Sequence, residues 1–404
     1  MKVLQINSFF SVGGPPRIMN GIYTTLTENG HECKIAAARE KILFPEDSIM
    51  IGNPKGAYIN AIESRILDND GFLAIKSTKE LLKQIDEYNP DIIQIHNLHG
   101  YYIDAEILFN HLKGCGKPVI WTLHDCWSMT GHCPHFSIIH CDRYIDGCYQ
   151  CPQKKEYPAS YVFDQSQRNW RRKKEAFTNV PHMTIVTPSQ WLANIVGTSY
   201  LKSYSVKVIH NGIDLKDFSY CPGQLRKNYS LENKHIVLGV AQNWAEHKGF
   251  EDFIRLSEML DEDYQVVMIG LTDNQMKAIP HRILGLKRTN SIDELVQWYS
   301  NAQVFVNLTY QDTFPTVNIE ALACGTPVIT YKTGGSPEAV DESCGWVVEQ
   351  GNVAKVASII QSMGDKQQYQ DKAIARSKLF DRKTKYLEYI ELYQDMMNKA
   401  EGNE

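Results

Sequence analysis

The chain has 404 residues, of which 43% are hydrophobic and 22% charged, the ordinary balance of a globular protein long enough for roughly two or three domains. A net charge of −5 gives no reason to expect nucleic acid as a main partner. The first residues lack the apolar run and cleavage site of a secretory signal, and no segment approaches the roughly 20 apolar residues of a membrane helix. We therefore expect a cytoplasmic protein.

The first half of the chain alternates short apolar runs with helical patterns. An apolar run at residues 3–6 predicts a strand, and after a pair of glycines and a pair of prolines a helix can begin at Arg17 and end at Asn29. Further strands are predicted at residues 34–38, 92–96, 119–123 and 184–187, with a helix over residues 79–88 among them. Strands that alternate with helices favour a parallel, doubly wound sheet.

A second series of the same kind follows the turn-rich segment 210–214. Its predicted strands are residues 236–241, 265–269, 282–284, 304–308 and 327–330, and its predicted helices are residues 250–260, 291–300 and 316–324. The sequence therefore predicts an α/β protein of two Rossmann-like domains, residues 1–208 and 209–382. Residues 383–404 then form a terminal helix with one apolar face, which either caps the second domain or returns to the first.

Folds of this kind bind ligands at the carboxyl ends of their strands, so chemistry is expected in the loops that follow the strands. Gly13 and Gly14 let the backbone approach a phosphate or sugar, although an ordinary tight turn explains the same pair. They do not form a GxGxxG fingerprint, so a nicotinamide cofactor is not indicated. His124 follows the strand at residues 119–123 and either points into a cleft between the domains or is a structural histidine beside a carboxylate.

The most informative segment is residues 312–330. Asp312 lies in a loop, and Glu320 lies eight positions later, one turn into a predicted helix. A carboxylate at position 320 could accept two hydrogen bonds from a ribose, and one at position 312 could hold sugar hydroxyls. Between them, backbone N–H groups that can face a diphosphate belong to Thr313, Phe314, Thr316 and Val317, whereas Pro315 has none.

This segment resembles the Glu-x7-Glu motif of retaining family-4 glycosyltransferases, which have the GT-B fold of two Rossmann-like domains that face each other across a cleft. The likeness covers nearly the whole chain, and its other matching positions are Gly13-Gly14, His124 and residues 187–189, 210–214, 239–249 and 334–338. Within the family the chain is most similar to bacterial enzymes that build capsular polysaccharide or exopolysaccharide.

The resemblance implies transfer of a sugar, with retention of configuration and without a metal, from a nucleotide-diphosphate donor to a glycan or lipid-linked acceptor. It implies that Glu320 binds the donor ribose and that Asp312 grips the transferred sugar. Lys248 would neutralise the leaving diphosphate, as a positive charge does beside a developing anion. His124 would orient the reacting sugar. The remaining implied contacts are those of Gly13 and Gly14 with the cleft and of Thr313, Phe314, Pro315 and Thr316 with the phosphates.

Two positions depart from the family pattern. Asp312 stands where the family has Glu and is one methylene shorter. Asn243 stands where the family has an Arg five residues before the Lys, so one positive charge at the donor is missing. The residues that could supply this charge are Arg17, Arg282, Lys287 and Arg288. A nucleotide-sugar epimerase of the same fold and a non-catalytic relative that binds nucleotide sugars remain alternatives.

Five of the ten cysteines lie within residues 126–151, in a segment near 124–160 that we expect to be an insertion in the first domain. Cys148 and Cys151 have the spacing of a metal knuckle, and Cys133 and Cys141 could complete a four-thiolate site. A structural zinc ion, an iron–sulfur cluster and plain reduced thiols all remain open. The alternative ligands nearby are His132, His135 and His140.

A basic run precedes the last strand of the first domain, and its members are Arg168, Arg171, Arg172, Lys173 and Lys174. On a helix such a run is typical of a solvated face. It could also attract the anionic inner face of a membrane, which would suit an acceptor carried on a lipid.

Overall fold

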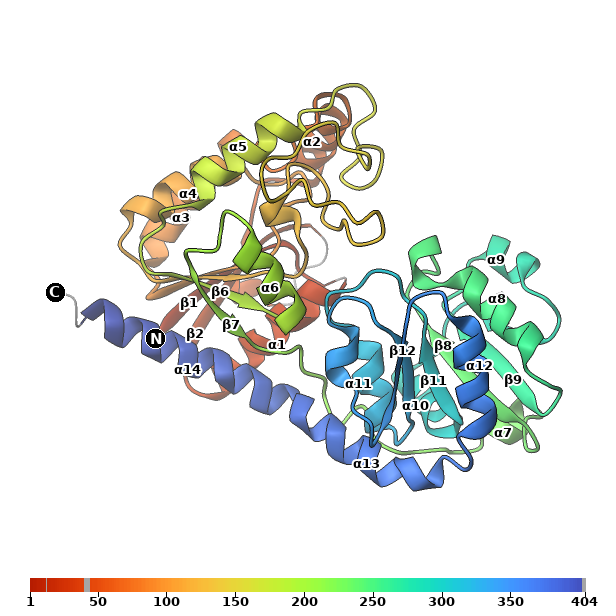
Figure 1. Cartoon of the computed structure of the whole chain (residues 1–404). Helices are drawn as coiled ribbons and strands as arrows, with labels where there is room; N and C mark the ends of the chain where they lie inside the picture. Colours follow the sequence, from red (N-terminus) through yellow and green to blue (C-terminus); the bar gives the residue numbers. More distant parts are fainter. Residues whose placement is uncertain (12, 40–43, 402–404) are drawn as a thin grey trace. The chain divides into compact units, whose positions relative to one another are not determined.

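The computed structural model describes residues 1–11, 13–39 and 44–401, which form two compact units (Figure 1). The first unit contains Met1–His210 and the chain from Tyr386 onward, and the second unit contains Asn211–Lys385. Each unit is built on one parallel sheet. This architecture confirms the predicted α/β class.

The first sheet has seven strands in the order β3-β2-β1-β4-β5-β6-β7. They are β1 (Lys2–Phe9), β2 (Glu32–Arg39), β3 (Ser48–Met50), β4 (Ile92–Ile95), β5 (Val119–Thr122), β6 (Met183–Thr187) and β7 (Ser205–Val208). The helices of this unit are α1 (Gly14–Glu28), η1 (Pro45–Asp47), α2 (Pro54–Leu67), α3 (Ile75–Tyr88), α4 (Ala105–Gly114), η2 (Trp127–Met129), α5 (Ser166–Phe177), α6 (Gln190–Thr198) and most of α14 (Arg382–Glu401). The strand order reverses between β1 and β4, so the loops after these strands mark the ligand edge of the sheet.

The first helix begins earlier than the sequence suggested. Residues 3–8 of β1 are buried without a break, as in a parallel strand covered on both faces. Helix α1 then starts at Gly14 rather than at Arg17. Pro15 and Pro16 fit within its first turn, because the N–H groups of a first turn have no partner inside the helix.

The terminal helix α14 joins the core of the first unit. Its residues Tyr386, Tyr389 and Tyr393 are buried there. A Cβ atom at Gly21 of α1 would lie 2.1 Å from the ring of Tyr386, so the glycine is what lets the two helices approach. From Tyr386 onward the chain therefore belongs to the first unit rather than capping the second.

The second sheet has six strands in the order β10-β9-β8-β11-β12-β13. They are β8 (His235–Val240), β9 (Tyr264–Ile269), β10 (Ile283–Leu286), β11 (Val304–Asn307), β12 (Val328–Tyr331) and β13 (Gly345–Val348). The helices of this unit are α7 (Leu225–Asn228), η3 (Glu246–Lys248), α8 (Phe250–Met259), α9 (Asp273–Ala278), α10 (Ile292–Asn301), α11 (Thr316–Ala323), η4 (Ser336–Ala339), α12 (Val353–Ser362), α13 (Gln367–Ser377) and η5 (Lys378–Phe380). Here the order reverses between β8 and β11, and the loops after these two strands mark the second ligand edge.

Both faces of the second sheet are covered by apolar side chains. Val237 and Leu238, which are neighbours on β8, belong to different hydrophobic clusters. Successive side chains of a strand point to opposite faces, so each cluster fills one face. This burial leaves the strand ends as the exposed edge of the layer.

Candidate functional site

Two loops meet at the ligand edge of the second sheet. The loop after β8 contains η3, which ends in Lys248, and the loop after β11 contains Asp312. Nζ of Lys248 donates a hydrogen bond of 2.8 Å to Oδ2 of Asp312, and the two side chains are 28% and 20% exposed. The fold thus brings together two predicted site residues that lie far apart in the sequence.

Gly249 holds Lys248 in this place. Its φ of 77° is in the left-handed region, and a Cβ atom there would lie 2.3 Å from the carbonyl oxygen of Leu308, just after β11. The two loops are also joined by a hydrogen bond of 2.8 Å from the N–H of Tyr310 to the carbonyl of His247. Only glycine allows so close an approach of the two loops.

Glu320 lies on α11 with 4% of its surface exposed. The hydroxyl of Tyr299 donates to its Oε2 at 3.1 Å, and the hydroxyl of Thr316 donates to its Oε1 at 3.3 Å. A carboxylate has about four acceptor positions, so these donors fix its orientation while it can still accept hydroxyls of a ligand. Its orientation is set by residues on α10 and α11.

The segment between the two carboxylates forms the start of α11. Pro315 is the N-cap residue, and its ring cannot cap the first-turn N–H groups, the first of which belongs to Thr316. The N–H of Phe314 donates to Oδ1 of Asp312 at 3.3 Å, and Phe314 itself is buried beside Phe380. The uncapped helix start favours a negatively charged ligand beside Asp312 and Lys248.

A buried polar cluster behind α11 was not predicted. Nδ2 of Asn318 donates to Oγ of Ser336 at 3.0 Å, and Asn307 donates to Oδ1 of Asn318 at 2.8 Å. The hydroxyls of Thr330 and Ser336 are 2.6 Å apart. These bonds tie α11 to the ends of β11 and β12 and to η4. The Gly-Gly-Ser-Pro-Glu segment that contains Ser336 was the available signal.

The residues that could supply the missing positive charge lie in different parts of the structure, and only some of them are at the ligand edge. Asn243 is exposed in the loop after β8. Arg282 precedes β10 and donates to the carbonyl of Leu260 at 2.8 Å, so it lies at the amino edge of the sheet, away from the ligand edge. Lys287 and Arg288 follow β10 at the ligand edge, where Lys287 pairs with Asp273. Arg17, on α1, is the candidate from the first unit.

His124 lies at the ligand edge of the first sheet, just after β5. Its Nε2 is 2.9 Å from Nδ1 of His96, and Nε2 of His96 is 3.0 Å from Oε1 of Gln5. Nε2 of Gln5 donates to the carbonyl of Met19, so Oε1 of Gln5 must accept. His96 therefore donates from Nε2 and accepts at Nδ1, which assigns a proton to Nε2 of His124.

Both histidines of this pair are neutral near pH 7. Burial lowers the pKa of His124 to about 4, although the nearby Asp125 carboxylate opposes the shift. Burial and the neighbouring His124 lower the pKa of His96 well below its usual value. The hydrogen bonds that link Gln5, His96 and His124 also require the imidazole of His96 to be neutral, because His96 accepts at Nδ1. His96 follows β4 as His124 follows β5, and this shared position was the signal that could have predicted the pair.

The carboxylate next to His124 pairs with a different histidine. Oδ2 of Asp125 is 2.8 Å from Nε2 of His99, and Nδ1 of His99 is 2.9 Å from the hydroxyl of Tyr157. Burial acts to raise the pKa of Asp125, but His99 brings it down to about 2. Burial likewise acts against the charge of His99, but Asp125 raises its pKa above the usual value. Asp125, which one of the two alternatives placed beside a structural His124, thus forms an ion pair with His99 instead.

The predicted glycine loop lies at the start of α1. Gly13 is the N-cap residue, with a φ of 105° that favours glycine, and Gly14 is the first helical residue. Both are exposed. Val12, between them and Ser11, lies outside the described residues.

Comparison with known families identifies the chain. Residues 12–217, just over half of the chain, match the family described as Glycosyltransferase Family 4. Residues 223–380 match the family described as Glycosyl transferases group 1. The chain belongs to glycosyltransferase family 4.

Several curated relatives of this family-4 glycosyltransferase have names that refer to polysaccharide assembly. Escherichia coli WcaC, named as a colanic acid biosynthesis glycosyl transferase, is 24% identical over 67% of the chain and 67% of its own length. Staphylococcus aureus CapM, named for capsular polysaccharide biosynthesis, is 26% identical over 44% of the chain and 51% of its own length. The N,N'-diacetylbacillosaminyl-diphospho-undecaprenol alpha-1,3-N-acetylgalactosaminyltransferase of Campylobacter jejuni is 28% identical over 35% of the chain. The matched regions span 40% to 67% of the length of these relatives.

Solved structures share the fold over nearly the whole chain. Sucrose-phosphate synthase from Thermosynechococcus elongatus has a TM-score of 0.73 at 16% identity and covers 98% of this chain and 99% of its own. Anabaena HepE, solved with UDP-glucose, has a TM-score of 0.67 at 16% identity and covers 98% of this chain and 100% of its own. These neighbours confirm the GT-B fold of this family-4 glycosyltransferase.

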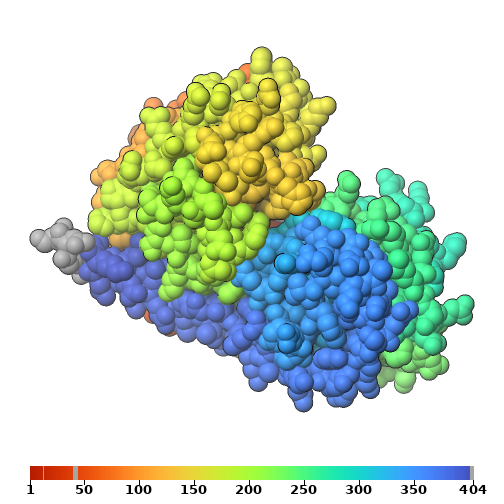
Figure 2. Space-filling view, in the orientation of Figure 1, coloured from red at the N-terminus to blue at the C-terminus, as the bar shows by residue number. Residues whose placement is uncertain are grey.

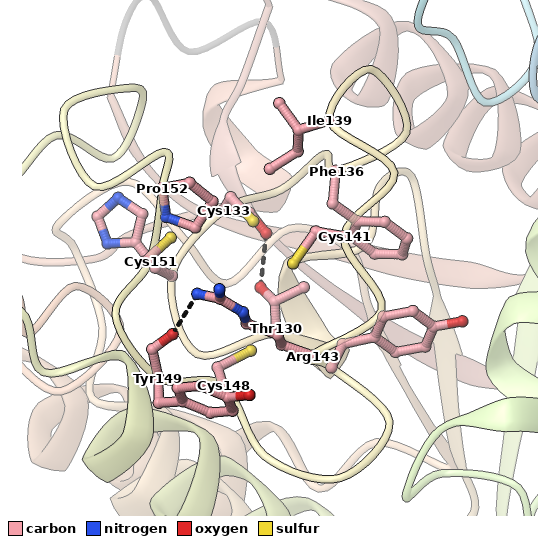
Figure 3. Close-up of a pocket in the computed structure, with 12 residues that line it drawn as sticks. Thr130, Cys133, Phe136, Ile139, Cys141, Arg143, Cys148, Tyr149, Cys151 and Pro152 are labelled. Carbon is pink, nitrogen blue, oxygen red and sulfur yellow. Dashed lines mark hydrogen bonds between the residues drawn. The ribbon is translucent and has the colours of Figure 1, made fainter.

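The cysteine-rich segment of the glycosyltransferase surrounds a small cavity (Figure 3). All four predicted metal ligands line it, namely Cys133, Cys141, Cys148 and Cys151. All ten cysteines are free thiols. Within residues 1–11, 13–39 and 44–401, no group of three or more His, Cys, Asp or Glu side chains is already arranged to hold a metal ion. Nδ1 of His132 is engaged at 2.5 Å by Oδ1 of Asp68, and His140 is exposed.

The basic run on α5 is not one solvated face. Arg172 pairs with Glu106 and lies over the ring of Phe72, while Lys173 is buried and donates to the carbonyl of Trp127 at 2.9 Å. The prediction of a continuous basic face is therefore wrong for these two residues. The exposed members of the run are Arg168, Arg171 and Lys174.

Proposed function

We propose that this family-4 glycosyltransferase is a retaining hexosyltransferase, which moves a sugar from a nucleotide-diphosphate donor to a glycan or lipid-linked acceptor during assembly of a cell-surface polysaccharide. The observation that carries the proposal is the meeting of Lys248 and Asp312 beside Glu320 at the strand-order reversal of the second sheet. Acidic groups for hydroxyls, a cation and an uncapped helix start are what a nucleotide sugar requires of a protein.

Each part of the donor has a matching group in the second unit. Glu320 accepts hydrogen bonds from the ribose hydroxyls, and Asp312 accepts them from the transferred sugar. The N–H groups at the start of α11 face the diphosphate. Lys248 has three N–H donors, so it can keep Asp312 oriented while it stabilises the charge that develops on the leaving diphosphate. The donor site needs no metal for this role.

His124 serves as a neutral positioning group in this proposal. Its Nε2–H donates to His96, and its low pKa keeps it from acting as a proton donor near pH 7. A neutral imidazole beside the reacting sugar avoids adding a positive charge next to a sugar carbon that itself becomes positive. The proton of the acceptor hydroxyl then goes to the leaving phosphate.

The names of the relatives support the substrate classes. Anabaena HepE was solved with UDP and with UDP-glucose, which supports a nucleotide-sugar donor. The Campylobacter enzyme is named for an acceptor linked to diphospho-undecaprenol, and WcaC and CapM are named for extracellular polysaccharides. An acceptor carried on a lipid would place the enzyme at a membrane surface.

We propose that contact with the membrane is peripheral and is made by α2 with the adjoining loop. Among the described residues, no helix combines the length and the apolarity needed to cross a bilayer. Five large apolar side chains of α2 are 40% or more exposed, and they are Tyr58, Ile59, Ile62, Ile66 and Leu67. The exposed loop residues Tyr161, Val162 and Phe163 lie beside them, because the N–H of Tyr161 donates to the carbonyl of Arg65 at 2.7 Å. Such an apolar helix face with exposed Lys55 and Arg65 suits an anionic lipid surface.

Flotation with liposomes tests this contact. The protein should float with vesicles that contain anionic lipid, and the double variant Ile59→Glu/Ile62→Glu should not. Ile292→Glu, on an equally exposed apolar residue of α10, should float like the wild type. Flotation that is unaffected by the double variant would place the contact elsewhere, and no flotation of the wild type would end the membrane proposal.

A donor screen tests the transfer itself. Purified protein is incubated with UDP-, GDP-, dTDP- and CMP-sugars, and free nucleotide is measured. Release with one donor class, lost in Glu320→Ala and His124→Ala, supports the proposal, and the anomeric configuration of a transferred product reports retention. Epimerised donor without nucleotide release would identify an epimerase. Binding without turnover would identify a non-catalytic relative.

A further inference from the structure

The segment between β5 and α5 has little regular structure to hold it. Residues 123–165 contain one short element, η2, and the rest of this described stretch is turns and irregular chain. In Figure 2 the segment forms the gold and yellow part of the surface. Irregular segments of this length inside a compact domain need an organising constraint. The side chains that it buries include Trp127, Phe136 and Tyr144. These three side chains belong to the main hydrophobic cluster of the first unit, so packing anchors part of the segment.

Four thiols of this segment converge on one cavity. Figure 3 shows Cys133, Cys141, Cys148 and Cys151 around it, on successive loops. Cys133 and Cys151, which are 18 positions apart in the sequence, thus line the same cavity.

The loop that bears Cys133 is pressed against Cys148. The N–H of Gly131 donates to Sγ of Cys148 at 3.2 Å. A Cβ atom at Gly131 would lie 1.9 Å from the carbonyl oxygen of Ser166 and 2.9 Å from Cβ of Cys148, so glycine is needed for this approach. A backbone N–H directed at sulfur also stabilises a thiolate, which is the form that binds metals.

Other side chains near the cavity are already engaged or lie outside it. His132 is paired with Asp68, and Cys126 is buried and does not line the cavity. Arg143 lines the cavity, and its guanidinium is held by the carbonyls of Tyr149 and Gln150 at 2.8 Å and 2.6 Å. The available donor set is therefore four sulfur atoms, with the guanidinium of Arg143 beside them.

We propose that Cys133, Cys141, Cys148 and Cys151 bind one Zn²⁺ as four thiolates and that this ion fastens residues 123–165. Each S–H bond gives its proton to solvent as a Zn–S bond forms, so four protons leave for each ion that binds. The resulting site has a net charge of −2, which Arg143 partly balances. The side chains are not yet at ligand spacing. Zn–S distances of about 2.3 Å require the four side chains to move closer together, and the loops that carry them have no regular structure.

Metal analysis of the whole protein tests the proposal. We expect about one zinc ion per chain after purification without chelator, and release of that zinc when a mercurial reagent titrates the thiols. Cobalt exchanged for the zinc should give the visible absorption of a tetrahedral four-thiolate site. This readout requires no variant, so it remains decisive if the variants fail to fold.

Matched variants locate the ligands. Cys148→Ser and Cys151→Ser should each lower the zinc content severalfold, whereas Cys221→Ser, on an exposed cysteine of the second unit, should keep it. A zinc-free wild type with all thiols reactive would overturn the proposal. A disulfide between Cys133 and Cys151 in the purified protein, or iron in place of zinc, would overturn it as well.

Discussion

Replacing Lys248 by Met separates a catalytic contribution from a structural one. The change removes the ammonium group and keeps most of the aliphatic stem, so packing around η3 is retained. Asp312 loses its partner at 2.8 Å but still accepts from the N–H of Phe314. The variant therefore mainly removes one positive charge from the proposed diphosphate site.

The two contributions differ strongly in size. The Lys248 and Asp312 side chains are 28% and 20% exposed, so solvent screens the pair, and its loss should lower the free energy of unfolding by about 0.2–1 kcal/mol. Loss of a donor that stabilises developing negative charge costs about 2.7–4 kcal/mol, or roughly 100- to 1,000-fold in rate. We therefore expect a large loss of kcat/KM with a small change in stability.

The assay compares kcat/KM for donor cleavage with urea unfolding of the same samples. Lys234→Met is the control, because Lys234 precedes β8 at the opposite end of the strand from Lys248, where it donates to the carbonyl of Glu262. It should retain full activity. A loss of kcat/KM below about tenfold in Lys248→Met, or a stability loss that explains the lost activity, would refute the assigned role.

Three further changes test other parts of the structure. Glu320→Gln should weaken donor binding by about 1–2 kcal/mol, or roughly 5- to 30-fold by calorimetric titration, because hydrogen bonds to ribose lose their charge, whereas the exposed Glu342→Gln should not. Gly249→Ala should lower the free energy of unfolding by about 1–3 kcal/mol in urea, and an unchanged value would mean that the φ of 77° is not required. Stability should fall as the pH drops from 6.5 toward 4, because the pKa of His124 is lowered from 6.5 to about 4 and the unfolded chain takes up protons first. In His96→Gln, the melting temperature should fall less steeply between pH 6.5 and 4, because one of the two buried neutral histidines is gone. An equally steep fall would contradict the buried neutral pair.

The central strands were predictable from the sequence, and three edge strands were not. Strands β1, β4, β5, β8, β11 and β12 are apolar runs because both of their faces are covered. The missed strands β3, β7 and β13 are the last strands at sheet edges, and they are short. In β7, for example, no residue of Ser205–Val208 is fully buried. Strands of three or four residues are too short for their apolar pattern to stand out from loops.

The burial of single side chains was harder to predict from the sequence. The sequence predicts Lys173 as part of a basic surface. In the structure it is buried, and its ammonium lies 3.3 Å from the ring centre of Trp127. Local patterns do not show that α5 presents this residue to the insertion. Tertiary packing decides such cases.

The candidate site was predictable only in part, because tertiary packing decides some of its contacts as well. Lys248 and Asp312 each follow a strand, and a parallel sheet collects such loops at one edge. The pairing of His96 with His124 depends in addition on β4 lying next to β5, and that of Asn318 with Ser336 depends on the position of η4. Strand order and loop paths are set by long-range contacts, which spacing along the chain does not encode.

Hydrogen exchange tests most directly whether the second unit holds the donor. Amide exchange is followed with and without the nucleotide sugar that the enzyme cleaves. Protection is expected at Thr313, Thr316 and Val317, with further protection around Lys248. Binding that leaves these amides unprotected, or that protects only the first unit, would contradict the donor site proposed here.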